Sequence, residues 1–212
     1  MNILITGAGE QLGRDLLRVL GQAYACTAFT QKELDICDPR AVQKTVDDVK
    51  PDVVINAAAY SQVNQAEEAA EEAYRINALG VSHLAIASDA AGAKLVHVST
   101  DDVFDGSKGE PHDEMIQSNL TIFGKSKLLG EQFVKAVCPR HFIVRSLAEN
   151  QETIKLVDDS FDSSTYTIHL AECIGRLITT ERYGTYLVFE TSTGGLFTYG
   201  LDSSKSERRH SV

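Results

Sequence analysis

The chain has 212 residues, 43% of them hydrophobic, and its 20 lysines and arginines against 30 aspartates and glutamates give a formal net charge of −10. This is the composition of a globular protein that can bury a sizeable core. The acidic balance argues against nucleic acid or an anionic membrane as a partner, because both bind clustered basic surface. No apolar run approaches the ~20 residues of a membrane span, and the first residues lack the features of a signal peptide.

Short apolar runs alternate with longer amphipathic stretches up to residue 145. Strands are expected at 2–6, 25–29, 52–56, 94–99 and 141–145. Helical spacing of apolar residues is expected over 12–20, 39–49, 69–91 and 122–137. Mostly apolar strands are typical of a parallel sheet that is buried on both faces. Their alternation with helices predicts an α/β protein with a Rossmann-like, doubly wound parallel sheet.

The pattern is weaker after residue 145. We expect a strand over 154–157, a helix over 168–177 and a strand over 185–189. The polar stretch 203–212 has no periodicity and is expected to be a disordered tail.

The cysteines are scattered without any C-x-x-C pair, at Cys26, Cys37, Cys138 and Cys173. This spacing favours reduced cysteines in a cytoplasmic protein over a disulfide framework or a zinc site. No cluster of histidine, cysteine and carboxylate residues has ligand spacing, so the sequence predicts no metal.

The first expected strand runs directly into the glycine-rich stretch T-G-A-G-E-Q-L-G, residues 6–13. Glycines between a strand and a helix allow a tight turn, close approach of the backbone to a pyrophosphate and close helix–strand packing. An ordinary strand–helix turn is the alternative, but the alternating context favours a dinucleotide-binding loop.

Glu10 departs from the usual spacing of such a loop. A G-x-x-G-x-x-G pattern needs glycine at this position, and a G-x-G-x-x-G pattern needs it at Leu12. A carboxylate beside a pyrophosphate adds like-charge repulsion where the helix dipole attracts an anion. Two outcomes stay open: the loop binds its cofactor weakly, or Glu10 turns outward and Gly9 provides the close approach.

The second expected strand is followed by T-Q-K-E, residues 30–33, with no acid directly at the strand end to hold a ribose 2′-hydroxyl. Lys32 favours NADPH over NADH if it faces a 2′-phosphate. A solvated surface lysine is the alternative.

The fourth expected strand ends at Ser99, Thr100 and Asp101. Ligands of open parallel sheets bind beyond the carboxyl ends of the strands, so the Thr100 hydroxyl is expected to face that crevice. Further along, F-G-K-S-K opens a helix, and its first and last residues, Phe123 and Lys127, share one helix face.

With these motifs the chain resembles the extended short-chain dehydrogenase/reductase family and, within it, the dTDP-4-dehydrorhamnose reductases. Matching stretches lie at 3–13, 34–39, 51–60, 77–80, 95–106, 123–132 and 159–172. The resemblance implies NADPH- or NADH-dependent reduction of a 4-keto sugar in a dTDP-linked substrate of cell-surface polysaccharide biosynthesis. It also implies an NAD(P)-binding domain at 1–145 and a substrate-binding region at 146–202 that is shorter than in relatives.

The resemblance further assigns roles to individual residues. The implied cofactor contacts are Gly7, Gly9, Gln11, Leu12, Gly13, Asp35, Ile36, Asn56, Ala57, Ala58, Ala59 and Lys127. In the family, a threonine or serine, a tyrosine that protonates the ketone and a lysine form the catalytic set. Thr100 and Lys127 match this set, but Phe123 stands at the tyrosine position.

A phenyl ring has no proton to donate, so we expect weak or lost reductase activity. The alternatives are a non-catalytic relative that binds a nucleotide or a protein, and a degenerate copy without a function of its own. Tyr166 and His169 are candidate replacement acids, although packing roles are favoured for both. Arg145 is interpreted equally as an ion-pair partner or a ligand contact.

Two further departures from the family pattern bear on the substrate site. Asp102 stands where the family has an aromatic residue, and the segment that follows the fifth strand in relatives is missing between 146 and 154. Less of the substrate would be enclosed as a result. Loss of elements from a sheet edge exposes apolar surface, so self-association into a homo-oligomer is expected.

Overall fold

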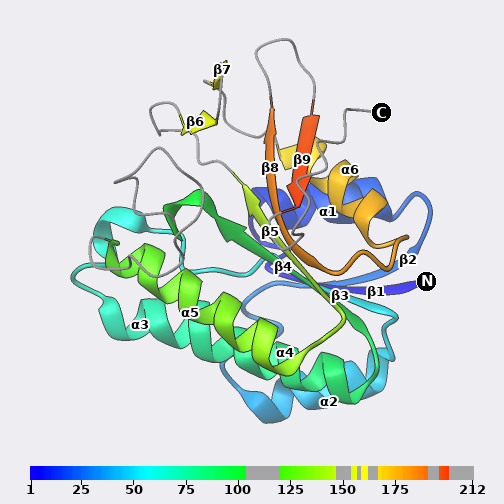
Figure 1. Ribbon diagram of the computed structural model, residues 1–212. Coiled ribbons are helices and arrows are strands. Elements are labelled where there is room, and N and C mark those ends of the chain that lie inside the picture. The colour runs from blue at the N-terminus through cyan, green and yellow to red at the C-terminus, as the bar shows by residue number, and fades with distance from the viewer. Residues whose placement is uncertain (104–119, 147–153, 157–158, 162–166, 191–195, 201–212) are drawn as a thin grey trace.

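The computed structural model describes residues 1–103, 120–146, 154–156, 159–161, 167–190 and 196–200. Its main sheet has seven strands (Figure 1). In chain order these are β1 (Asn2–Thr6), β2 (Ala25–Phe29), β3 (Val53–Asn56), β4 (Lys94–Thr100), β5 (His141–Ser146), β8 (Gly184–Glu190) and β9 (Leu196–Gly200). The first six pair in parallel in the spatial order β2-β1-β3-β4-β5-β8, and β9 pairs antiparallel with β8 at the edge. The predicted Rossmann-like α/β fold is confirmed.

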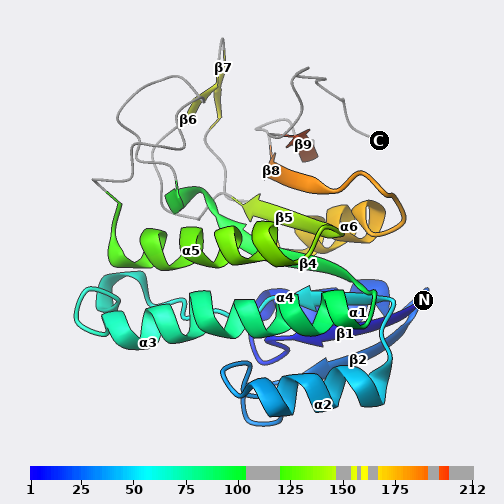
Figure 2. The same ribbon diagram turned by 60° about the horizontal axis from the view of Figure 1, so that its bottom comes forward.

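Helices cover both faces of this sheet, as Figures 1 and 2 show. Two of them, α1 (Gln11–Leu20) and α6 (Thr167–Leu177), pack together on one face. The opposite face is covered by α2 (Pro39–Val49), α4 (Val81–Ala90) and α5 (Ile122–Val137). None of the helices in the described ranges has the length and apolarity that a membrane crossing requires.

The apolar strands are buried because successive side chains point to opposite faces of the sheet. In β1, Ile3 and Ile5 contribute to the core beneath α1 and α6, whereas Leu4 contributes to the core beneath α2 and α4. All three are fully buried. The same alternation in β3 and β5 builds two hydrophobic layers, one on each face of the sheet.

Local signals set the ends of α2. The Asp38 carboxylate accepts hydrogen bonds from the backbone N–H groups of Arg40 and Ala41, at 2.9 and 3.2 Å, and Pro39 occupies the first helical position. A short acceptor at the N-cap and proline in the first turn both favour a helix start. The helix ends at Lys50, which adopts a left-handed conformation with φ 48°.

The helix predicted over 69–91 is interrupted. It consists of α3 (Ala70–Tyr74), a π-helical turn from Arg75 to Gly80, and α4. A Cβ at Gly80 would lie 2.7 Å from the Ile36 side chain, so the turn packs tightly against the segment after β2. Periodicity did not reveal this turn because its apolar spacing is still helical.

The remaining predictions for the C-terminal part are mixed. The predicted helix and the strand after it match α6 and β8 within a residue. The strand expected over 154–157 corresponds to β6 (Ile154–Leu156), which pairs antiparallel with β7 (Asp159–Phe161). Neither β7 nor β9 was expected from the sequence. The predicted tail, the gap after the fifth strand and Tyr166 lie outside the described residues.

Candidate active site

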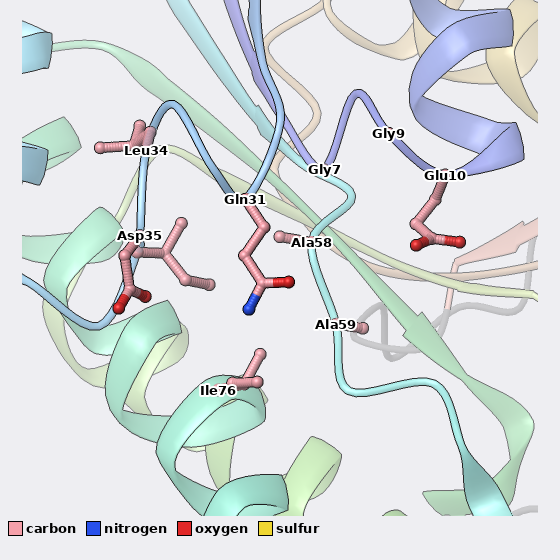
Figure 3. Close-up of a pocket in the computed structure, with 10 residues that line it drawn as sticks. Gly7, Gly9, Glu10, Gln31, Leu34, Asp35, Ala58, Ala59 and Ile76 are labelled. Carbon is pink, nitrogen blue, oxygen red and sulfur yellow. The ribbon is translucent and has the colours of Figure 1, made fainter.

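A pocket opens where the strand order reverses, at the carboxyl ends of β1 and β3 (Figure 3). In open α/β sheets, ligands bind at such switch points. The pocket has a volume of about 540 Å³, its open mouth included. Its lining residues come from the loops after β1, β2 and β3 and from the π-helical turn: Gly7, Gly9, Glu10, Gln31, Leu34, Asp35, Ile36, Ala58, Ala59 and Ile76.

The glycine-rich loop forms one wall of this pocket. Gly7 has φ 77°, and a Cβ there would lie 2.5 Å from the backbone nitrogen of Ala58. A Cβ at Gly13 would lie 2.2 Å from the Gly7 carbonyl oxygen, so α1 packs directly on the loop. Beside Gly9, by contrast, the nearest atom to such a Cβ is 3.9 Å away. The loop therefore provides the turn, the packing and the open approach that a pyrophosphate at a helix N-terminus needs.

Replacing Gly13 by alanine is expected to lower the free energy of unfolding by about 3 kcal/mol, because the methyl group would overlap backbone atoms that cannot move aside. Gly9→Ala is the matched control. Its methyl group meets only ordinary van der Waals contact, so a change within about 0.5 kcal/mol is expected. Urea unfolding followed by circular dichroism measures both. Equal losses in the two variants would contradict the packing role of Gly13.

Glu10 lies in the lining of the pocket. It is the N-cap of α1, with φ −86° and ψ 166°, and its side chain makes no capping hydrogen bond. Figure 3 shows its carboxylate turned toward the loop that carries Ala58 and Ala59. Of the two orientations left open by the sequence, the structure shows the inward one, which puts a negative charge beside the N-terminus of α1.

The segment after β2 presents an amide to the pocket. Gln31 lines the pocket, whereas the neighbouring Lys32 is exposed. The Glu33 carboxylate accepts hydrogen bonds from the Thr30 backbone N–H and hydroxyl, at 2.9 and 2.8 Å, and these bonds hold its pKa below the usual range. The Glu33 carboxylate is therefore engaged within its own turn, and Lys32 adds no positive charge to the pocket lining.

Asp35 and Ile36 line the same side of the pocket. The Asp35 carboxylate accepts a hydrogen bond from the Cys37 backbone N–H at 2.9 Å and pairs with Arg75 at 3.5 Å. The Cys37 bond is the larger cause, and both interactions lower the pKa of Asp35. Arg75 itself is held by a bidentate ion pair with Glu72, at 2.7 and 2.8 Å.

Asn56, at the end of β3, connects three strands from within the core. Its amide oxygen accepts hydrogen bonds from the Thr6 hydroxyl at 2.7 Å and from the Ala58 backbone N–H at 3.1 Å. Its amide nitrogen lies 3.2 Å from Nδ1 of His97 on β4. Burial, with the nearby Lys127 charge, holds the pKa of His97 well below its usual value, so this histidine is neutral. The network fixes the backbone of the loop that lines the pocket.

The other predicted cofactor residues lie at the edge of the pocket or behind it. Gln11 is exposed, and its amide donates to the Thr167 hydroxyl at 3.1 Å. Leu12 and Ala57 pack against the core beneath α1. The pocket residues that the sequence did not single out are Gln31, Leu34 and Ile76. From the sequence, Ile76 could have been recognised as a pocket residue only because it directly precedes the N-A-L-G motif.

A second group of predicted residues meets at the end of β4. The Thr100 hydroxyl lies 3.2 Å from carboxylate oxygens of Asp101 and Asp102 and accepts a hydrogen bond from the Asp102 backbone N–H at 3.1 Å. The first turn of α5 packs against this segment, because a Cβ at Gly124 would lie 2.4 Å from the Asp102 carbonyl oxygen. The structure thus brings Thr100 and the F-G-K-S-K helix turn together.

Phe123 occupies an apolar environment in this turn. It is 7% exposed and forms a small cluster with Ala66 and Ala73. Tyr60 and Ile122 pack against that cluster.

Lys127 is buried one helical turn further along α5. It is 4% exposed, and its ammonium group donates to the Val98 carbonyl oxygen of β4 at 2.7 Å. Burial lowers its pKa to about 8, while the nearby Glu131 carboxylate opposes the shift. A lysine held in this way is still charged at neutral pH but loses its proton in mildly alkaline solution.

We expect Lys127 to titrate with a midpoint near pH 8, because the folded protein disfavours its charged form. NMR of the lysine side-chain carbons, with Lys127→Met to identify the signal, measures the midpoint. The exposed Lys44, whose pKa is raised by its bond to Asp48, is the internal control. Between pH 8 and 10.5 the unfolded chain holds more protons at this site, so its contribution to stability rises with pH there. A midpoint at the usual value of 10.5 would contradict the burial argument.

Arg145 forms an ion pair. Its guanidinium contacts the Glu131 carboxylate at 2.9 and 2.6 Å, and the two side chains are 4% and 1% exposed. The pair joins α5 to β5 beneath the site. Of the two interpretations of Arg145 from the sequence, the structure supports the ion-pair partner.

His169 lies on α6, which covers the face of the sheet opposite α5. It is therefore separated by the sheet from Phe123, in the first turn of α5. The described ranges contain no group of three or more histidine, cysteine or carboxylate side chains that could hold a metal ion.

This chain is similar in sequence to several known proteins. Residues 1–146 match the family model described as the RmlD substrate binding domain. The spore coat polysaccharide biosynthesis protein SpsK of Bacillus subtilis is 37% identical over 195 residues, which cover 82% of this chain and 69% of SpsK. The dTDP-4-dehydrorhamnose reductase of Aggregatibacter actinomycetemcomitans is 36% identical over 210 residues, which cover 87% of this chain and 71% of that enzyme.

Solved structures give the same picture. The crystal structure of dTDP-4-dehydrorhamnose reductase from Bacillus anthracis in complex with NADP matches with a TM-score of 0.79 and 38% identity, over 90% of this chain and 75% of that one. The corresponding protein of Clostridium acetobutylicum matches with a TM-score of 0.76 and 35% identity, over 88% of this chain and 73% of that one.

Proposed function

Since this chain belongs to the RmlD substrate binding domain family, we propose that it is a reductase of dTDP-linked 4-keto sugars in polysaccharide biosynthesis, with a turnover slowed by the loss of its proton donor. The observation that carries the proposal is that the Lys127 ammonium binds the Val98 carbonyl oxygen, two residues before Thr100, near the carboxyl end of β4. This is where open α/β sheets place their ligands. The relatives named for this reaction support the substrate class.

The positive φ of Gly7 and the packing distances of the glycine-rich loop support its fit to a dinucleotide. We propose that the loop and the N-terminus of α1 hold the pyrophosphate, and that Asp35 and Ile36 flank the adenosine end. Lys127 would hold the nicotinamide ribose. NADPH or NADH, when bound, supplies a hydride. The NADP in the Bacillus anthracis relative supports NADPH as one of the two.

Phe123 explains the slow turnover in this proposal. General acid catalysis contributes about 10²–10⁴-fold to such a reaction. At about 1.36 kcal/mol per tenfold change, its loss removes roughly 3–5 kcal/mol of transition-state stabilisation. Thr100 keeps a hydroxyl near the site, but that hydroxyl is engaged with the neighbouring aspartates.

A direct test of this proposal is cofactor binding. Titration of NADPH fluorescence with the protein is expected to show saturable binding. The absence of binding at millimolar cofactor would eliminate both the reductase and a nucleotide-binding relative. Binding without any turnover, in the natural chain and after Phe123→Tyr, would instead support the second candidate, a non-catalytic relative, which the apolar surroundings of Phe123 favour.

Glu10→Gly is expected to tighten NADPH binding about tenfold, because it removes a carboxylate from beside the pyrophosphate site. Glu10→Gln is the matched variant that removes the charge and keeps the size. If Glu10→Gln reproduces most of the gain in NADPH affinity, charge repulsion is the cause of the weak binding. If only Glu10→Gly raises the affinity, the side chain at position 10 blocks the approach of the pyrophosphate. Unchanged affinity in both variants would contradict a weakening role for Glu10.

The domain assignment and self-association remain part of the proposal. We propose that residues 1–145 bind the cofactor and residues 146–202 contact the sugar. Leu79 and Ile86, seven residues apart in the helical segment, are 51% and 53% exposed, which supports a homo-oligomer. Light scattering on Ile86→Lys beside the natural chain tests this, with a fall in molar mass expected.

A further inference from the structure

We propose that Tyr60 is the proton donor for the residual reduction that this chain carries out, in place of the hydroxyl missing at position 123. The inference rests on the proposed function, because it concerns the protonation of the same keto sugar. It is carried by the position of Tyr60, which directly follows the pocket residue Ala59 in the chain and packs against the cluster that contains Phe123.

Tyr60 follows directly after two residues of the pocket lining. Ala58 and Ala59 line the pocket from the loop after β3, on the side that faces the glycine-rich loop (Figure 3). The half-buried Tyr60 packs against the cluster that contains Phe123. A phenol at this point in the chain stands beside the position where the resemblance places the family's acid.

The backbone of Tyr60 is held in a fixed relation to Phe123. The fully buried Asn77 accepts a hydrogen bond from the Tyr60 N–H at 2.8 Å and donates to the Tyr60 carbonyl at 3.2 Å. Asn77 also donates to the Ser126 hydroxyl at 3.0 Å, and Ser126 donates to the Phe123 carbonyl at 2.7 Å. Hydrogen bonds through Asn77 and Ser126 thus connect the backbone of Tyr60 to that of Phe123.

The hydroxyl of Tyr60 is available for this role. Within the part of the chain that the structure describes, it has no hydrogen-bond partner, although both backbone groups of the residue are bonded. The Phe123 ring carries no polar atom that could engage this hydroxyl. A phenol that is not engaged elsewhere keeps its proton for transfer to a substrate within hydrogen-bond reach, as general acid catalysis requires.

The step balances as follows. The ketone carbon of the sugar accepts a hydride from NADPH, which is thereby oxidised to NADP⁺. The π bond of the carbonyl breaks, and its oxygen takes the proton of the Tyr60 hydroxyl. The product is the secondary alcohol, and the Tyr60 phenolate regains a proton from water.

Four chains test the assignment: the natural chain, Tyr60→Phe, Phe123→Tyr and the double variant. Reduction of dTDP-4-dehydrorhamnose by NADPH is followed in each. Tyr60→Phe is expected to lower kcat of the natural chain about 100-fold with little change in NADPH affinity. In the Phe123→Tyr background the same change is expected to cost less than about threefold, because the restored hydroxyl supplies the proton.

Tyr24→Phe is the matched control. Tyr24 is also half-buried, but it precedes β2 and so lies at the opposite end of the strands. Its loss of a hydroxyl is expected to leave kcat unchanged. NADPH fluorescence and circular dichroism show whether each variant folds and binds.

A readout without turnover uses tyrosine labelled with ¹³C at Cζ, with Tyr60→Phe to identify the Tyr60 signal. Saturation with dTDP-4-dehydrorhamnose in the presence of NADP⁺ is expected to shift that signal and to leave the Tyr24 signal in place.

An unshifted Tyr60 signal overturns the assignment, as does a Tyr60→Phe chain that retains the natural rate. A natural chain without turnover beside an active Phe123→Tyr variant overturns it too, but leaves the proposed function intact. If Phe123→Tyr is also inactive, the proposed function fails as well.

Discussion

Phe123→Tyr is expected to raise the reductase kcat by about 10²-fold, because a positioned general acid contributes about 10²–10⁴-fold and Tyr60 already supplies about 100-fold of this in the natural chain. The new hydroxyl would lie on the face of α5 that carries Lys127, one helical turn away. The buried ammonium of Lys127 favours the phenolate that forms as the proton leaves. The loss of dihydronicotinamide absorbance with dTDP-4-dehydrorhamnose as substrate measures the gain.

Two companion variants show whether the gain comes from the hydroxyl. Phe123→Leu changes the ring without adding a donor and is expected to stay at or below the natural rate. Lys127→Met in the Phe123→Tyr background is expected to remove most of the gain, because the phenol loses its neighbouring charge. If Phe123→Tyr binds NADPH normally but turns over no faster than the natural chain, proton donation does not limit this enzyme.

Glu131→Gln is expected to lower the free energy of unfolding by about 3–5 kcal/mol, the usual cost of breaking a buried ion pair from one side. The amide cannot neutralise the Arg145 guanidinium, which is 4% exposed and held by both carboxylate oxygens. Because the pair joins α5 to β5, α5 is expected to loosen first. Urea unfolding and hydrogen exchange of the α5 amides measure the two effects.

The control is a pair of the same chemistry on the surface. Lys44 and Asp48 form an exposed ion pair on α2, so Asp48→Asn is expected to cost no more than about 0.5 kcal/mol. Replacement of both buried partners, as Glu131→Leu with Arg145→Met, is expected to recover part of the loss, because the uncompensated Arg145 charge is removed whereas the buried Lys127 ammonium still lacks the nearby Glu131 carboxylate. A loss below about 1 kcal/mol for Glu131→Gln would show that water reaches the pair.

Most of the sheet could be predicted from the sequence because strand and helix periods are local. The runs that became β1, β2, β3, β4 and β5 were recognised within a residue of their ends. The interruption at Arg75–Gly80 could not be recognised, because the contact of Gly80 with Ile36 joins segments more than forty residues apart. The edge strand β9 was missed because an antiparallel edge follows a different pattern from the buried parallel strands.

Part of the candidate site could likewise be predicted from the sequence, and part could not. The glycine-rich loop, Thr100, Phe123 and Lys127 were identified from motifs whose residues are close together in the chain. The inward position of Glu10 and the choice of Gln31 over Lys32 depend on how three loops meet at the switch point.

The sequence by itself determined that this chain is a doubly wound α/β protein with a dinucleotide loop and with no hydroxyl at position 123, because each of these follows from residue type and short spacing. Only the tertiary structure decided that Glu131 neutralises Arg145, that Asn77 ties Tyr60 to the turn containing Phe123, and that Glu10 faces the pocket. These contacts join segments from different strands and helices. Their partners depend on the register of the sheet and the packing of its helices, which no local period encodes.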